Sequence, residues 1–219
     1  MKRWIEGNAN LSWMEDIRVA LRVGLTGGMG SGKTLAASFF KERGAHVIDA
    51  DAICRDLVRP HQPAWEEIVH HFGRDILNPD QSLHRTKLAE VVFHDEKKRA
   101  LLEKILHPRV FEVEEKLFQS ICAKEPHALI VVDAALLIES GNYRQMDKVL
   151  VVTSDRENQV RRVMRRNSLS REQVLARLES QMSLEEKIKK ADYVLENNST
   201  IQSLRTKVES LFRELKSFA

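Results

Sequence analysis

The chain has 219 residues, of which 42% are hydrophobic and 31% are charged, and its formal net charge is +3. Such a length fits one α/β domain with an insertion, and the hydrophobic share suffices for a buried core. The small net charge does not support a general nucleic-acid-binding surface. Neither a membrane-spanning run nor a signal peptide is apparent, and Cys54 and Cys122 form no disulfide or metal pattern. We therefore expect a cytoplasmic protein that binds neither nucleic acid nor membrane.

The first predicted elements flank a glycine-rich segment. Residues 1–17 lack periodicity and are interpreted as an N-terminal extension. A strand is predicted from Arg18 to Thr26 and a helix from Lys33 to about Arg43, where Gly44 provides the stop. Between them, residues 27–34 read GGMGSGKT, which matches the P-loop pattern G-x-x-x-x-G-K-[ST] in a strand–loop–helix context.

This loop predicts a site for a nucleoside triphosphate. Its backbone N–H groups and the start of the next helix can hold phosphate oxygens. Lys33 would lie at the β- and γ-phosphates, and the hydroxyl of Thr34 would ligate Mg²⁺. A glycine-rich turn can also be a plain connector, but the preceding strand and the Lys-Thr pair favour the phosphate site. The loop residues expected to contact the nucleotide are Gly28, Met29, Gly30, Ser31, Gly32, Lys33 and Thr34.

Two carboxylates follow the second predicted strand, His46–Asp49, in the sequence VIDAD. The carboxyl ends of parallel strands face the crevice in which ligands bind. One carboxylate can hold Mg²⁺ or its waters while the other accepts a proton, and we assign the metal to Asp49 and the general base to Asp51. The alternative is that one of them caps a helix starting at Ala52, because aspartate is a preferred N-cap. For Asp51, capping and catalysis fit the pattern equally well.

A long insertion separates this strand from the next one, predicted from Ala128 to Asp133. Roughly eighty residues without a strong strand signal are too many for a simple connection. Apolar residues from Leu101 to Leu117 recur at helical spacing. We interpret residues 60–126 as a helical substrate-binding domain. Within it, Pro108 directly after His107 favours a helix boundary with an incidental histidine.

Strands alternate with helices over the rest of the chain, which predicts an α/β fold with a parallel sheet. Asp133 ends the apolar run ALIVVD, a weak Walker B signal that the P-loop strengthens. Further strands are predicted at Lys148–Thr153 and Tyr193–Glu196, and apolar spacing from Ile201 to Leu215 predicts a helix that covers the sheet. The nucleotide-binding core is predicted to comprise residues 18–59, 127–154 and 191–219.

Residues 155–190 are interpreted as an arginine-rich lid. Seven arginines lie between Asp155 and Arg177, and the pattern reads as helix, turn at Asn167–Ser168, and helix. A lid could deliver guanidinium groups to the transferred phosphoryl and exclude water. A solvated amphipathic helix is the simpler alternative, and a nucleic-acid patch ranks last because no aromatic residues are interleaved. Spacing alone does not choose among candidates such as Arg162, Arg166 and Arg177.

Six motifs together resemble one family. LTGGMGSGKT, VIDAD, LHP, LLIESG, RLESQ and ADYVLENN occur in the order and approximate spacing of the dephospho-CoA kinase family, over about Val19 to Arg213. The resemblance implies a P-loop kinase with a five-stranded parallel sheet flanked by helices, a helical substrate-binding insertion and a helical lid. It also implies that ATP phosphorylates the ribose 3′-hydroxyl of dephospho-coenzyme A, giving coenzyme A in the last step of its synthesis.

The resemblance implies roles for particular residues. Asp51 matches the base, Arg166 matches the lid arginine at the transferred phosphoryl, and Asn197 matches an asparagine near the adenine of ATP. Gln159 and Arg162 match lid positions, and the latter is expected to contact the nucleotide. The residues expected to bind the acceptor are Arg85, His107, Arg177 and Gln181.

The chain departs from the family pattern D-x-P-L-L-F-E after the third strand, where it has Ala135 in place of proline and Ile138 in place of phenylalanine. It also has His84 in place of an aspartate before Arg85. Loss of the aromatic ring puts contacts to the acceptor in question. The alternative is a P-loop kinase of another small-molecule hydroxyl or of a nucleoside monophosphate, for which only the helical insertion would change meaning; an ATPase or a nucleotide-dependent switch follows. We expect a monomer or a small homo-oligomer.

Overall fold

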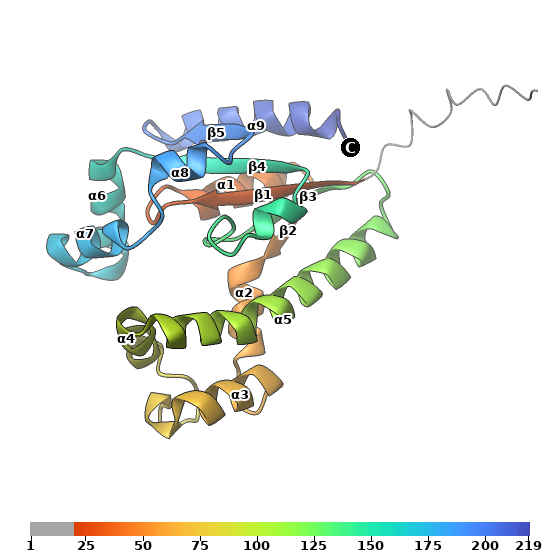
Figure 1. Ribbon diagram of the computed structural model, residues 1–219. Helices are drawn as coiled ribbons and strands as arrows, with labels where there is room; N and C mark the ends of the chain where they lie inside the picture. Colours follow the sequence, from red (N-terminus) through yellow and green to blue (C-terminus); the bar gives the residue numbers. More distant parts are fainter. Residues whose placement is uncertain (1–19) are drawn as a thin grey trace, which may run out of the picture.

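The computed structural model describes residues 20–219 (Figure 1). The predicted extension 1–17 and the predicted strand start at Arg18 lie outside the described residues. A five-stranded sheet forms the core with the strand order β2-β3-β1-β4-β5, and every neighbouring pair is parallel. This confirms the predicted sheet. The strands are β1 (Leu21–Gly27), β2 (His46–Asp49), β3 (Leu129–Asp133), β4 (Lys148–Thr153) and β5 (Tyr193–Glu196).

Helices cover both faces of the sheet and form two further parts of the molecule (Figure 1). Those around the sheet are α1 (Lys33–Glu42), α2 (Ala50–Leu57), the C-terminal half of α5 (Glu96–Cys122), η3 (Asn142–Gln145) and α9 (Ile201–Lys216). Below the sheet lie α3 (Pro63–Phe72), η2 (Arg74–Ile76) and α4 (Arg85–His94). Beside it lie α6 (Arg156–Asn167) and α7 (Arg171–Glu179), and α8 (Leu184–Ile188) lies against the sheet next to β4.

The strands are apolar on both faces because both faces are covered. Alternate residues of β1, such as Val23 and Leu25, pack against Phe40 of α1 and Leu204 of α9. On the opposite face, residues of β2, β3 and β4 pack against α2, α5 and the loop after β3. Side chains alternate between the faces of a strand, so a continuous apolar run is required when neither face meets water.

The helical insertion has a small core of its own. Trp65 and Ile68 of α3 pack against Leu88 of α4 and Ile105 of α5, and all four side chains are buried. The indole N–H of Trp65 donates to the carbonyl oxygen of Gln81 at 2.8 Å, so its polar atom is also satisfied. The insertion and the sheet are joined by α2 and by the long helix α5. The residue boundaries of the core, insertion and lid stay a prediction.

The predicted helix boundary at Pro108 is wrong. Helix α5 runs through it as one element of 27 residues. Proline has no N–H and so leaves one carbonyl of the preceding turn without its helical donor. One residue further, the guanidinium of Arg109 donates to the carbonyl oxygen of Ile105 at 2.6 Å and to Glu67 of α3 at 2.6 Å. The helix continues because its two halves are packed into separate cores.

A buried carboxylate lies where α5 meets the sheet. Glu114 is 5% exposed and accepts a hydrogen bond from the side-chain nitrogen of Asn142 at 2.7 Å. Its second oxygen has no hydrogen-bond partner within residues 20–219. Burial raises the pKa of Glu114, and the bond from Asn142 and the charge of Arg22 oppose this only in part.

Glu114→Gln is expected to raise the free energy of unfolding at neutral pH, because glutamine keeps an acceptor for Asn142 and removes a buried charge. The folded pKa lies above the ordinary value of 4.5, so the stabilisation from the protonated group is complete below that value and is lost as the pH rises through the folded pKa. Urea unfolding across the acidic-to-neutral range measures this. The difference between variant and wild type should grow with pH, whereas Glu103→Gln, at an exposed position of α5, should show no such trend. Parallel pH profiles would contradict the expectation.

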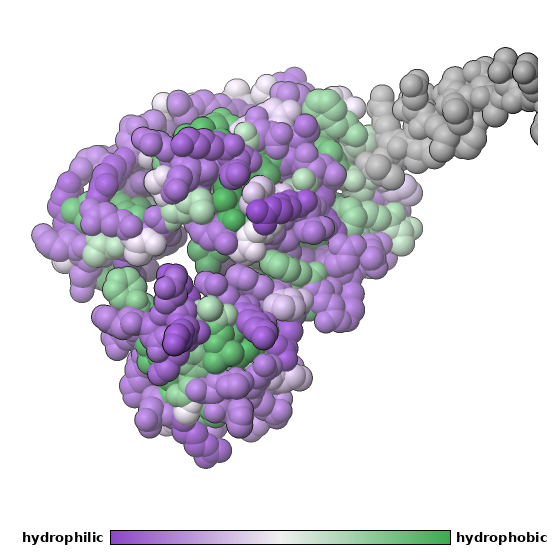
Figure 2. Space-filling view, viewed as in Figure 1, coloured by the Kyte–Doolittle hydropathy of each residue, from purple (hydrophilic) through white to green (hydrophobic). Residues whose placement is uncertain are grey.

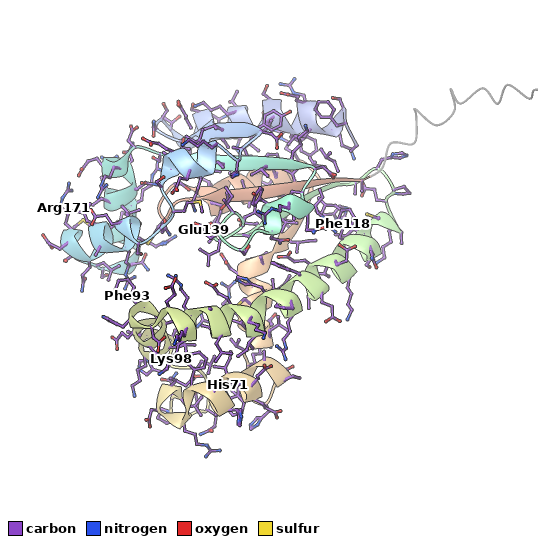
Figure 3. The ribbon with its side chains drawn as sticks, viewed as in Figure 1. His71, Phe93, Lys98, Phe118, Glu139 and Arg171 are labelled. Carbon is purple, nitrogen blue, oxygen red and sulfur yellow. The ribbon has the colours of Figure 1, made fainter. Side chains whose placement is uncertain are left out.

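A second buried charge connects the last helix of the predicted lid to the loop after β3. Lys187 of α8 is 2% exposed, and its ammonium lies 2.7 Å from the carboxylate of Glu139. Figure 3 shows Glu139 below the sheet, on the side that faces the insertion.

None of the helices in residues 20–219 combines the length and apolar character that a membrane crossing requires.

Candidate active site

The P-loop connects β1 to α1 and is held from behind by a buried asparagine. Asn197 is 6% exposed, and its side-chain nitrogen donates to the carbonyl oxygen of Ser31 at 2.8 Å. Gly32 has φ +99°, in the left-handed region, and a Cβ at this position would lie 2.1 Å from the same nitrogen. Backbone conformation and close packing therefore both require glycine here.

Gly32→Ala is expected to lower the free energy of unfolding by more than Gly44→Ala, which is its matched control. Both glycines have nearly the same φ, +99° and +98°, so both variants carry the left-handed cost of about 1–2 kcal/mol. Gly44 has open space around it, whereas Gly32 also meets Asn197. Urea unfolding measures the two costs. Equal losses would mean that the contact with Asn197 relaxes freely.

A cavity of about 410 Å³, the P-loop cavity, lies over this loop. Its lining residues are Gly27, Gly28, Met29, Gly30, Gly32, Lys33, Thr34, Leu35, Asp51, Ala135, Arg162, Val163, Arg166 and Gln181. The structure thus brings the loop together with a carboxylate from α2 and side chains from the predicted lid. Ser31, Asp49 and Asn197 are outside this lining.

Lys33 is the cation that lies near both Asp133 and Asp51 at the cavity. Its ammonium lies 2.5 Å from Asp133 and 3.7 Å from Asp51. Asp133 is 6% exposed, and burial raises the pKa of its carboxyl, while the Lys33 charge lowers it. In the parallel register Leu25 pairs with Asp133, and Asp133 pairs with Asp49, which brings these groups to one edge of the sheet. Asp133, which we did not include among the predicted site residues, therefore positions Lys33.

The two carboxylates of VIDAD differ in what they contact. Asp49 is the N-cap of α2 and accepts from the backbone N–H of Ala52 at 2.7 Å; its other oxygen lies 3.6 Å from Arg55. The capping alternative is thus correct for Asp49, although the helix begins at Ala50. Asp51 lies in the first turn of α2 with its side chain 50% exposed and lines the P-loop cavity. Of the pair, only Asp51 lines this cavity.

The lid contacts the P-loop through two polar side chains. The guanidinium of Arg162 donates to the carbonyl oxygens of Gly30 and Asn197, at 3.2 and 2.9 Å. The side-chain oxygen of Gln181 accepts from the backbone N–H of Met29 at 3.0 Å. Arg166, one helical turn beyond Arg162, is exposed and lines the cavity. Arg162 therefore braces the loop, and Arg166 extends into the space above it.

Two more cavities lie between the lid, α2 and the insertion. One of about 580 Å³, the α4–α7 cavity, has Arg85 and Arg177 on opposite walls. The other, of about 620 Å³, is the arginine cavity, lined by Arg55, Arg59 and Arg85 among others. Figure 2 shows the notch that separates the lid from the insertion on this side. We did not predict Arg55 or Arg59, because VIDADAICRDLVR carries no motif beyond its aspartates.

The comparisons with known proteins agree with this geometry. The profile of the dephospho-CoA kinase family matches residues 21–203. This chain belongs to the dephospho-CoA kinase family. A dephospho-CoA kinase of Bacillus cereus is 43% identical over 192 residues, which are 88% of this chain and 96% of the relative. One of Aquifex aeolicus is 38% identical over 89% of this chain and 97% of its own.

Solved structures extend the likeness to the fold. A Thermus thermophilus protein of 32% identity has a TM-score of 0.74, with 90% of this chain and 98% of that chain covered. The dephospho-CoA kinase of Campylobacter jejuni, at 27% identity, has a TM-score of 0.66 with 90% and 97% covered. The P-loop kinase fold implied by the sequence is therefore confirmed.

Three residues singled out in the sequence of this member of the dephospho-CoA kinase family lie away from the lining of the P-loop cavity. Asn197 is buried and donates to the carbonyl oxygen of Ser31 behind the P-loop, and its place near the adenine stays a prediction. His107 lies midway along α5 with its ring stacked on Phe111 at 5.8 Å, and it lines none of the three cavities described here within residues 20–219. Ile138 is 5% exposed and packs in the core beside Leu137, so this departure from the family pattern lies in the packed core.

Proposed function

We propose that this chain transfers the γ-phosphoryl group of ATP to the ribose 3′-hydroxyl of dephospho-coenzyme A, which gives coenzyme A. The observation that carries the proposal is the P-loop cavity, which joins a complete P-loop to the carboxylate of Asp51, 3.7 Å from the ammonium of Lys33. Membership of the family supports the choice of acceptor.

The donor set fits ATP with Mg²⁺. Magnesium in kinase sites is held by few protein oxygens together with phosphates and water. Thr34 lines the cavity at the first turn of α1, and the carboxylates of Asp49, Asp51 and Asp133 gather at the same sheet edge. Thr34 would hold the magnesium ion, with Asp49 acting through water; the ion would neutralise phosphate charge.

The side chains at the cavity have separate roles in the proposed reaction. Lys33 and Arg166 present positive charge where negative charge develops on the transferred phosphoryl. Asp51 accepts the proton of the attacking hydroxyl or orients it. Arg162 and Asn197 donate to carbonyl oxygens of the loop and keep it in its phosphate-binding form. Asp133 keeps Lys33 directed into the cavity.

The arginine cavity suits the diphosphate of the acceptor. Arg55 follows Asp51 by one helical turn, about 6 Å along α2. The two residues lie on either side of Cys54, near enough to affect its thiol. Burial and then Asp51 raise the pKa of this thiol, and the charges of Arg85 and Arg55 lower it. A diphosphate attached to the ribose that Asp51 contacts would therefore meet Arg55 and Arg85.

The test is a turnover assay with Mg·ATP and dephospho-coenzyme A, with the product identified by mass and phosphate position. Coenzyme A is the expected product. ATP binding without that product would leave a P-loop kinase of another hydroxyl or of a nucleoside monophosphate, which a competition assay among acceptors would then identify.

A further inference from the structure

An aromatic ring stands exposed on the insertion, opposite the lid. Phe93 of α4 is 72% exposed. Figure 3 shows it on the edge of α4 that faces α7, across the notch. A single exposed apolar side chain is ordinary on a protein surface. Phe93 differs because it lines the α4–α7 cavity of about 580 Å³.

One face of α4 and one face of α7 form the two walls of this cavity. Arg85, Ala89 and Phe93 are spaced four residues apart and share one face of α4. Ala176 and Arg177 belong to the facing side of α7. Each wall has an alanine near its middle, which leaves room between the helices for a flat group. Phe93 and Arg177 supply the two side chains that stack well on a planar ring.

The cavity adjoins the site of the proposed reaction on two sides. Ser180 lines it, and its chain neighbour Gln181 lines the P-loop cavity. Arg85 lines both this cavity and the arginine cavity. An acceptor whose 3′-hydroxyl lies at Asp51 has two branches at its ribose, the base and the diphosphate. The arginine cavity matches the anionic branch.

The base then requires an apolar, aromatic site. Among the described residues, neither the P-loop cavity nor the arginine cavity has a Phe, Tyr or Trp ring in its lining. The α4–α7 cavity has Phe93 together with Ala89 and Ala176. We infer that Phe93 is the stacking platform for the purine base of the acceptor, with the guanidinium of Arg177 opposite. This inference rests on the proposed function and adds the residue that selects a nucleotide-like acceptor.

The experiment pairs a protein change with a substrate change. Phe93→Leu is compared with wild type on dephospho-coenzyme A and on an analogue in which hydrogen replaces the base. Stacking of one base on an aromatic ring corresponds to roughly 5- to 100-fold in binding. Phe93→Leu should therefore raise KM for dephospho-coenzyme A by that factor, leave KM for ATP unchanged, and change kcat little. On the base-free analogue the variant and wild type should be equal, and Phe93→Tyr should restore the wild-type KM.

The outcomes separate this inference from the proposed function. If wild type makes no coenzyme A, the proposed function fails. If wild type is active and Phe93→Leu keeps its KM for dephospho-coenzyme A, the stacking role is wrong. An equal loss on both acceptors would also overturn it, since that indicates a structural role. Phe218→Leu, at a second exposed phenylalanine, is the matched control and should behave as wild type.

Discussion

Replacing Lys33 by methionine is expected to lower kcat by about 10³-fold or more. Lys33 lines the P-loop cavity, and methionine keeps nearly the length of the side chain while removing the charge that would meet the phosphates. Phosphoryl transfer depends mainly on positioning and charge neutralisation, so this loss falls on the transition state. Steady-state turnover with Mg·ATP and dephospho-coenzyme A measures it. Lys41→Met, at the exposed end of the same helix, is the matched control.

The same variant has a second effect, because it leaves Asp133 buried without its cation. Breaking a buried ion pair costs about 3 kcal/mol of stability, so urea unfolding should show a loss of that size. Adding Asp133→Asn removes the stranded charge and should recover much of the stability but none of the turnover. Normal turnover in Lys33→Met would remove Lys33 from the mechanism. Recovery of turnover in the double variant would assign the defect to folding.

The sheet and the P-loop could be predicted because their signals are local. Each strand is a continuous apolar run bounded by turn residues, and the bounds of β2, β4 and β5 match the prediction. Strand β1 ends one residue later than predicted, at Gly27, and β3 starts one residue later, at Leu129. Such shifts at the ends reflect hydrogen bonding to neighbouring strands, which no local pattern contains.

The missed features depend on contacts between distant segments. Pro108 predicts a helix end from its own chemistry, but packing of both halves of α5 overrides it. Ile138 stands where the family pattern has phenylalanine, yet only the fold reveals that this position is buried. The arginine cavity is lined by residues of α2 and by residues at the start of α4, about thirty positions further along the chain, so no local pattern predicts it.

The lid arginines illustrate how the fold decides between alternatives that spacing left open. Arg156 and Arg171 form surface ion pairs with Glu179 and Glu157, so the solvated-charge alternative is correct for them. Arg162 and Arg166 are four residues apart on one helix face and lie at different depths over the P-loop. The guanidinium of Arg162 donates to backbone carbonyl oxygens, so Arg166 is the lid arginine that we propose for the phosphoryl group.

Asp51→Asn is expected to lower kcat by about 10²- to 10⁴-fold with little change in the affinity for ATP. Asparagine has the size of aspartate and suits the first turn of α2, so the fold and the P-loop should be unaffected. It cannot accept the proton of the 3′-hydroxyl. Asp51→Glu keeps the charge near Lys33 but moves the carboxylate by one methylene, and a general base must lie within hydrogen-bond reach of its proton.

These two variants separate a base from a charge that merely balances Lys33. If the charge alone matters, Asp51→Glu keeps turnover while Asp51→Asn loses it. If Asp51 is the base, both variants lose turnover while binding ATP normally, as measured by titration calorimetry. Asp75→Asn, at an exposed carboxylate of the insertion, is the control and should retain full activity. Full activity in Asp51→Asn would show that the acceptor hydroxyl needs no carboxylate, and catalysis would then rest on Lys33, Arg166 and the phosphates alone.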